Sequence, residues 1–285
     1  MSVLRYLKPV VEKFPGLANY YRYSRDAKTL KANVLYREKL GFFFNGKDTM
    51  EEGEFEPKET HIFEKIITNY DMFVNIGANT GYYVCKALKQ GISTIAFEPN
   101  QLNVNILLRN IAANNFDAEF QLFPVALSDS PGVLPMFGGS TGASLVEGWA
   151  GQTSSALVPI SLFDKTAAPL IEGKKCFVMI DIEGAELGCL KGANSLLASE
   201  CNNDFLIEIC VNEHQPKGVS VNPKLVETFE VIQSFGYVGY TVDSKMRKIE
   251  LSEIKEIQST SIDTLGVHNF LFSKSGDLIN DLKSE

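Results

Sequence analysis

The sequence predicts an α/β protein built on a mostly parallel β-sheet that is covered by helices on both faces. Two observations lead to this prediction. Short apolar segments, several of them rich in β-branched residues, recur along most of the chain, and amphipathic segments with helical spacing lie between them. Parallel neighbouring strands need a crossover connection, which is usually a helix. The alternation therefore favours a doubly wound sheet whose strands are buried on both faces.

The predicted elements follow one another regularly from about residue 58. The first apolar strand ends at a Gly-rich turn, and the segment after it places Val84, Ala87 and Leu88 on one helical face. Residues 138–156, rich in Gly, Ser and Thr, are expected to be a loop within an irregular stretch from 128 to 175. The predicted strands span 72–76, 94–98, 118–123, 176–182, 205–210, 237–242 and 269–273. The predicted helices span 60–70, 81–91, 103–115 and 185–198, with another around 225–232.

We divide the chain into an N-terminal extension, residues 1–57, and a main domain, residues 58–285. The extension is interpreted as a basic helical arm up to residue 40, followed by a short β-hairpin with its turn at 45–46. Residues 1–40 contain nine Lys or Arg and three Asp or Glu, a net charge of +6, with tyrosines interleaved. Since the whole chain has a net charge of −8, the remainder carries −14.

The composition argues against several classes of protein. The acidic net charge of the 285-residue chain argues against a protein whose main task is to bind nucleic acid. No segment resembles a signal peptide or a transmembrane helix, so we expect a cytoplasmic protein. The five cysteines are odd in number and show no CxxC spacing, which predicts free, mostly buried thiols.

The sharpest local signal is the Gly-rich turn at residues 75–81, between a predicted strand and a helix. Glu98 ends the next strand, 21 residues after Gly77, where a carboxylate can accept both hydroxyls of a ribose. A dinucleotide fingerprint would need Gly at the positions of Asn79 and Tyr82. S-adenosylmethionine (SAM) has no pyrophosphate, so a side chain at position 79 is compatible with SAM. The alternative is a βα turn that needs glycine only for its shape.

The segments VNIGANTGYYVCKAL, AFEPN, VALSDSPG and MIDIEGAELGCLKGA resemble the FkbM-type methyltransferases. The resemblance covers about residues 55–275. It implies a Rossmann-like class I methyltransferase fold with a seven-stranded sheet, the last strand antiparallel. It also implies SAM as the cofactor and methyl transfer to an oxygen of a sugar or natural product.

The resemblance also assigns residues. Glu98 would accept the ribose hydroxyls, and Asn75 stands where the family commonly has Asp. Asn retains an acceptor oxygen but lacks the charge that would favour the cationic methionine end of SAM. The SAM turn would comprise Gly77, Ala78, Asn79 and Gly81, and the residues near the adenine would be Ala126, Leu127 and Ser128.

Carboxylates gather after the apolar segment at 176–182. An alcohol acceptor benefits from a base that takes its proton, and the candidates are Asp181, Glu208 and the loop residue His214. Each also has a purely structural interpretation. Asp181 could accept hydrogen bonds from backbone N–H groups, Glu208 could belong to a buried polar network, and His214 could be a solvated loop residue. The side chains of Asp181, Glu183 and Glu208 could supply oxygen ligands to Mg²⁺. The sequence has no His/Cys pair spaced as in zinc sites, and we do not assign a metal to the protein.

These observations favour SAM-dependent O-methylation of a hydroxyl on a sugar, glycan or natural product, with a small-molecule or carbohydrate acceptor. Two alternatives stay open: an NAD-dependent oxidoreductase, and a non-catalytic binding protein with the SAM fold. Residues 1–40 could form a solvated face, cover the acceptor site, contact an anionic surface peripherally or mediate a homodimer.

Overall fold

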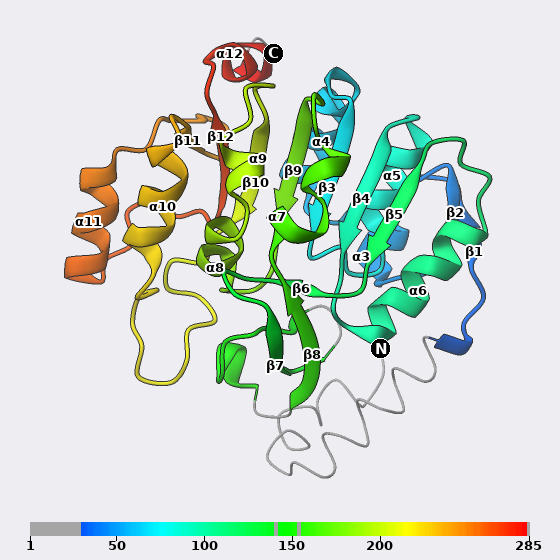
Figure 1. The fold of residues 1–285 in the computed structure, drawn as a ribbon, viewed down its shortest axis with the longest axis horizontal. Coiled ribbons are helices and arrows are strands. Elements are labelled where there is room, and N and C mark those ends of the chain that lie inside the picture. Colours follow the sequence, from blue (N-terminus) through cyan, green and yellow to red (C-terminus); the bar gives the residue numbers. More distant parts are fainter. Residues whose placement is uncertain (1–29, 140–141, 153–154, 284–285) are drawn as a thin grey trace.

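The structure is a computed structural model that describes residues 30–139, 142–152 and 155–283. A seven-stranded sheet with the order β11-β12-β10-β9-β3-β4-β5 runs through the centre of this part (Figure 1). The strands from β10 to β5 are parallel, and β12 lies antiparallel between β10 and β11. The predicted doubly wound sheet with an antiparallel last strand is therefore confirmed. The strands are β3 (Met72–Ile76), β4 (Ser93–Phe97), β5 (Phe120–Phe123), β9 (Cys176–Ile180), β10 (Asp204–Glu208), β11 (Val238–Thr241) and β12 (Asn269–Ser273).

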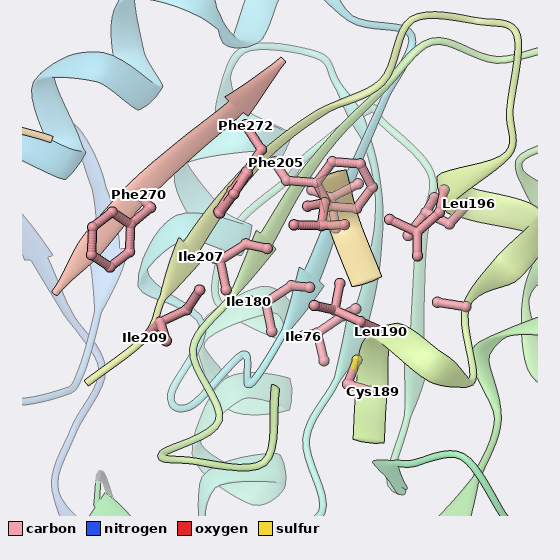
Figure 2. Packing of buried hydrophobic residues seen from close by; sticks show 14 of the residues in the cluster. Ile76, Ile180, Cys189, Leu190, Leu196, Phe205, Ile207, Ile209, Phe270 and Phe272 are labelled. Carbon is pink, nitrogen blue, oxygen red and sulfur yellow. The ribbon is translucent and has the colours of Figure 1, made fainter. Parts of the chain in front are cut away.

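Helices cover both faces of the sheet. Successive strand side chains point to opposite faces, so Val74 and Ile76 enter one apolar cluster while Phe73 enters another. Figure 2 shows the first cluster, in which Ile76 and Ile180 of the sheet lie near Leu190 of α8. Helices α7 (Phe163–Thr166), α8 (Glu186–Lys191), α9 (Asn194–Leu197), α10 (Leu225–Ser234) and α11 (Leu251–Thr260) contribute to this cluster. Helices α4 (Pro57–Ile66), α5 (Tyr82–Lys89) and α12 (Asp277–Lys283) contribute to the second.

The hairpin before the main domain begins earlier than the sequence predicted. Strands β1 (Leu35–Arg37) and β2 (Phe42–Phe44) pair antiparallel, and the turn lies at 38–41 instead of 45–46. A short helix, α3 (Asp48–Glu51), follows. Phe42 and Phe44 are buried in the second apolar cluster, and this burial at every second residue favours a strand over a helix. Residues 1–29, most of the predicted basic arm, lie outside the described residues.

Two asparagines of α6 (Gln101–Ala112) and its C-terminal turn hold the edge of this hairpin. The side chain of Asn114 accepts from the Phe43 N–H at 2.9 Å and donates to the Phe43 carbonyl at 2.8 Å. Asn110 does the same for Asn45, at 2.9 Å for both bonds, and also donates to the Thr80 carbonyl at 2.8 Å. Each side-chain amide thus forms the pair of backbone hydrogen bonds that a neighbouring strand would form. The Asn110 bonds also tie the hairpin to the turn after β3.

A small sheet that the sequence did not predict lies at and within the stretch expected to be irregular, between residues 126 and 161. Its strands are β6 (Ala126–Leu127), β7 (Gly132–Phe137) and β8 (Ser155–Ser161), in the order β6-β8-β7. Pro135 and Pro159 lie inside two of these strands, and proline normally argues against a strand. Apolar residues occupy both faces of β8, where Val158 is buried and Leu157 is 74% exposed. The usual alternation of apolar and polar residues is therefore missing.

The helix predicted over 185–198 is divided into α8 and α9. A Cβ on Gly192 would lie 2.1 Å from the Ser128 carbonyl oxygen, so the chain breaks the helix where it contacts Ser128. Helices α11 and α12 were not predicted. The 3₁₀ turns are η1 (Ile67–Asn69), η3 (Trp149–Gly151) and η4 (Ala168–Leu170).

The structure bears on the predicted state of the cysteines and on membrane-spanning helices. All five cysteines are described and free, and four of them are buried, as predicted. Over the described ranges, each helix is too short or too polar to cross a bilayer.

The Asn110 bonds predict a measurable stability difference between two similar asparagines. Asn110→Ala should lower the free energy of unfolding by about 2–4 kcal/mol, because it removes the three hydrogen bonds from this side chain to buried backbone groups of Asn45 and Thr80. Asn114→Ala is the matched control and should cost less than about 1 kcal/mol, since water can reach the exposed groups of Phe43. Urea denaturation of both variants measures the difference. Equal losses would contradict this account.

Candidate active site

The turn after β3 is formed by a very close approach of two strand ends. Gly77 has φ +90°, and a Cβ at this position would lie 1.8 Å from the backbone oxygen of Asp181, which follows β9. The Asp181 N–H donates to the Ile76 carbonyl at 3.0 Å. Any side chain at position 77 would force the two strand ends apart. Glycine is therefore required here by packing as well as by conformation.

The remainder of the turn leads into α5. Asn79 has φ 52°, and its side-chain oxygen accepts from the Thr80 N–H at 2.8 Å. Gly81 precedes α5 with φ 89°, and a Cβ there would lie 2.9 Å from Cγ of Leu107 on α6. Asn and Gly are the residues that adopt positive φ at least cost. The sequence GANTG is thus matched to the backbone conformation of the turn.

Glu98 follows β4 and holds the turn in place. One carboxylate oxygen accepts from the Asn79 N–H at 2.7 Å, and the other accepts from the Asn100 N–H at 2.8 Å and from the Asn103 side chain at 3.3 Å. Burial raises the pKa of this carboxyl to about 7, against the lowering effect of the three donors. Glu98 is only 5% exposed. Its carboxylate therefore holds the backbone of the turn in place, and it also lines a pocket beside the turn.

A pocket with an empty volume of about 610 Å³ opens beside this turn. The polar residues Asn79, Glu98, Asp181 and Glu183 are part of its lining. The apolar part of the lining consists of Ile76, Phe97, Val125, Ala126, Leu127, Met136, Leu145 and Ile182. Met136 comes from β7, so the small sheet covers part of this pocket.

A smaller pocket, with an empty volume of about 330 Å³, lies against the same turn. It shares Gly77, Asn79 and Asp181 with the larger pocket. Its other lining residues are Met50, Phe55, Asn75, Ala78, Tyr82, Tyr83 and Met179. The hydroxyl of Tyr82 and Oδ1 of Asp181 are buried and have no hydrogen-bond partner among the residues that the structure describes. Two polar groups around this pocket thus have unused bonding capacity.

Three carboxyl groups meet at the ends of different elements. Oxygen atoms of Glu56, Asp181 and Glu208 lie within 4.8 Å of one another. Burial, followed by repulsion from Asp181, raises the pKa of Glu56 to about 8. Burial, followed by repulsion from Glu183, raises the pKa of Asp181, while a side-chain hydrogen bond with Glu208 lowers it. Burial, followed by repulsion from Asp181, raises the pKa of Glu208 more strongly. Glu208 therefore keeps its proton to a higher pH than Asp181, and it is the donor in their hydrogen bond.

Glu183 connects the larger pocket to a loop region. Its carboxylate accepts from the indole N–H of Trp149 at 2.7 Å and lies 3.7 Å from Nδ1 of His214. The Ala150 N–H donates to the His214 carbonyl at 2.7 Å, which fastens the two loops together. Trp149 is 1% exposed, whereas the His214 side chain is 53% exposed. His214 therefore stands at the rim, beside Glu183.

The structure brings most of the predicted site residues together. Around the larger pocket lie Gly77, Asn79, Glu98, Ala126, Leu127 and Asp181, and around the smaller one lie Asn75 and Ala78. Glu208 belongs to the carboxyl cluster.

Three predicted residues lie outside both linings. Gly81 lies at the start of α5. His214 lies beside Glu183, which lines the larger pocket, and its ring packs edge-on against Trp149. Ser128, predicted near the adenine, lies against α8: a Cβ on Gly188 would be 2.8 Å from the Ser128 hydroxyl.

Other residues at the site were not predicted. Glu56, Met50 and Phe55 come from the segment before the main sheet, and Trp149 comes from the stretch expected to be irregular. Nothing in the local sequence marks Glu56 as a site residue. The position of Trp149 could have been suspected only because it is the single tryptophan of the chain.

Comparisons with known proteins complete the site description. The sequence model described as the methyltransferase FkbM domain matches residues 75–241. A comparison with curated protein sequences found no significant match.

Several solved structures are similar over most of the chain. Precorrin-6y C5,15-methyltransferase from Geobacter metallireducens GS-15 has a TM-score of 0.41 and 10% identity, covering 84% of this chain and 97% of that chain. An O-methyltransferase from Bacillus cereus in complex with SAH has a TM-score of 0.38 and 11% identity, covering 80% and 91%.

The FkbM match spans more than half of the chain. It includes the turn at Gly77, the carboxylate of Glu98 and the strand end at Asp181. The chain therefore belongs to the FkbM family of SAM-dependent methyltransferases.

Proposed function

We propose that the protein transfers a methyl group from SAM to a hydroxyl oxygen of a small-molecule or carbohydrate acceptor. The observation that carries this proposal is the arrangement of the two pockets. They share the turn at Gly77 and Asn79, and Asp181 stands between them. A ligand with an adenosine at one end and an amino acid at the other matches two pockets of unequal size that share lining residues.

In this proposal the adenosine of SAM occupies the larger pocket. Ala126 and Leu127 offer an apolar surface for the adenine. Glu98 accepts the two ribose hydroxyls, since each carboxylate oxygen can accept more than one hydrogen bond. The methionine end occupies the smaller pocket, near Asn75 and Ala78. The sulfonium then lies near Asp181, where negative charge favours it.

The acceptor hydroxyl is proposed to approach on the side of Asp181 and Glu183. Methyl transfer is an in-line displacement, so much of the rate depends on holding the oxygen and the methyl group in line. Asp181 is the proposed base because it carries the charge of the pair while Glu208 holds the proton. His214, beside Glu183 at the rim, is the second candidate. A product heavier by one CH₂ unit, detected by mass spectrometry, identifies the acceptor.

The assignment of Glu98 is tested by its removal. Glu98→Ala should lower SAM affinity at least about tenfold, because two charge-assisted hydrogen bonds to the ribose are lost. Glu119→Ala, which removes an exposed carboxylate outside both pockets, is the control and should leave the affinity unchanged. Calorimetric titration with SAM measures both. Unchanged affinity in a folded Glu98→Ala protein would disprove the assignment.

Glu98 also predicts a pH dependence of SAM binding. Its pKa of about 7 means that it takes up a proton as the pH falls below this value. The proton must leave before the carboxylate can accept both ribose hydroxyls. SAM affinity should therefore fall by up to about tenfold per pH unit below pH 7 and be constant above about pH 8. Titrations of Glu98→Gln, which cannot ionise, should lack this dependence. The same slope in Glu98→Gln would assign the effect to another group.

The role of Asp181 is tested by a substitution that keeps its shape. Asp181→Asn should lower turnover by about 10²-fold or more if Asp181 takes the proton, with little change in SAM affinity. His214→Ala tests the second candidate, and Glu213→Ala controls for changes to the same loop. Initial rates and SAM titrations separate catalysis from binding. Full activity of both Asp181→Asn and His214→Ala would exclude both residues as the base.

A further inference from the structure

We propose that Glu56, Asp181 and Glu208 bind a divalent cation with a preference for oxygen ligands, such as Mg²⁺ or Mn²⁺, beside the smaller pocket. One carboxylate oxygen from each residue lies within 4.8 Å of the others. A cation that holds oxygen ligands at about 2.0–2.6 Å keeps them about 3–5 Å apart. The cluster thus has the dimensions of half of a coordination shell, and the adjoining pocket leaves room for water or ligand oxygens.

The three side chains are held by different parts of the fold. Tyr83 donates its hydroxyl proton to Glu56 at 3.0 Å, and Tyr83 also contacts the Thr60 hydroxyl at 3.3 Å. Asp181 is fixed by its backbone bond to Ile76 at 3.0 Å. Glu208 ends a strand of the central sheet, paired with both β9 and β12. The ligand set is therefore positioned before any cation arrives, which reduces the entropy lost on binding.

An independent observation shows that this place lacks a bonding partner. Oδ1 of Asp181 is shielded from solvent, and apart from the hydrogen bond that the Asp181 carboxyl shares with Glu208 it has no partner among the described residues. Tyr82 is 2% exposed and lines the same small pocket. Its buried hydroxyl has no hydrogen-bond partner among the described residues. Buried polar groups without partners are rare and costly. A cation with its water ligands would satisfy both, the first directly and the second through water.

The charge around the cluster favours a cation. Lys47 is the positive group that acts on Glu56 and Asp181, whereas Glu59 and Glu183 add further negative charge.

The donor set points to a hard metal ion. All three ligands are carboxylate oxygens, which suit Mg²⁺ and Mn²⁺ better than Zn²⁺. The nearby Cys210 thiol donates to Glu208 at 3.5 Å. A single ammonium group would need fewer than three carboxylates. The cluster therefore fits a divalent ion better than the amino group of SAM.

The role of the cation rests on the proposed function. Beside Asp181 it would contact an acceptor hydroxyl, lower its pKa and orient it towards the methyl group. Binding of the ion itself does not depend on that role, so the two can be tested separately.

The experiment titrates the full chain with Mn²⁺ in the absence of SAM, followed by electron paramagnetic resonance. We expect one bound Mn²⁺ at concentrations up to about 1 mM, displaced by Mg²⁺. Glu56→Gln should weaken binding at least about tenfold, while it still accepts from Tyr83 and keeps its SAM affinity within about threefold. Glu54→Gln, which alters an exposed carboxylate two residues away, should bind Mn²⁺ like the wild type.

Four outcomes are informative. Absence of Mn²⁺ binding by the wild type overturns the proposal, as does equal binding by Glu56→Gln. If the wild type binds no Mn²⁺ and Glu56→Gln loses SAM affinity, the cluster serves the ammonium of SAM instead. If Mn²⁺ binds but SAM does not, the cation site stands and the proposed function fails.

An anomalous difference map from Mn²⁺-soaked crystals gives a measurement that needs no variant. A peak between the three carboxyl groups, about 2.0–2.5 Å from each ligand oxygen, is expected. A peak at any other place, with none here, overturns the assignment.

Discussion

The close approach of β3 and β9 is the constraint on which the rest of the site depends. Only glycine at position 77 allows the backbone of Asp181 to lie so near, since a Cβ would be 1.8 Å from its oxygen. This contact turns the chain sharply at the end of β3 and exposes the backbone of the turn to both pockets. It also fixes Asp181 as a wall that the two pockets share. One steric requirement thus keeps Asp181 in the lining of both pockets.

Glu98 illustrates how structure and binding can share one group. Its carboxylate holds the Asn79 N–H on one side and the Asn100 N–H on the other, so the turn is already shaped before a ligand enters. Pre-organised donors and acceptors spare the reorganisation that binding would otherwise require. Burial of the carboxyl opposes its ionisation. The same residue that shapes the turn is therefore sensitive to pH in the physiological range.

The N-terminal segment is an integral part of the site, although the family match begins at residue 75. Asn110 ties the hairpin to the turn through Asn45 and Thr80. Met50 and Phe55 line the smaller pocket, and Glu56 joins the carboxyl cluster. These residues precede the region that the family model matches, and they border the smaller pocket and the carboxyl cluster together with residues of the matched region.

The sequence alone predicted the central sheet, the glycine turn after its first strand and the place of Glu98 at the end of the next strand, because buried parallel strands and glycine turns leave strong local patterns. Asp181 and Glu208 were also found this way, since a carboxylate at the end of an apolar strand is unusual. The strands β7 and β8 escaped prediction because their prolines and two apolar faces obscure the strand pattern. Only the tertiary structure placed Glu56 beside Asp181 and Glu208, and Trp149 on Glu183. These contacts are formed by packing between residues that are far apart in the chain, and no local sequence pattern predicts them.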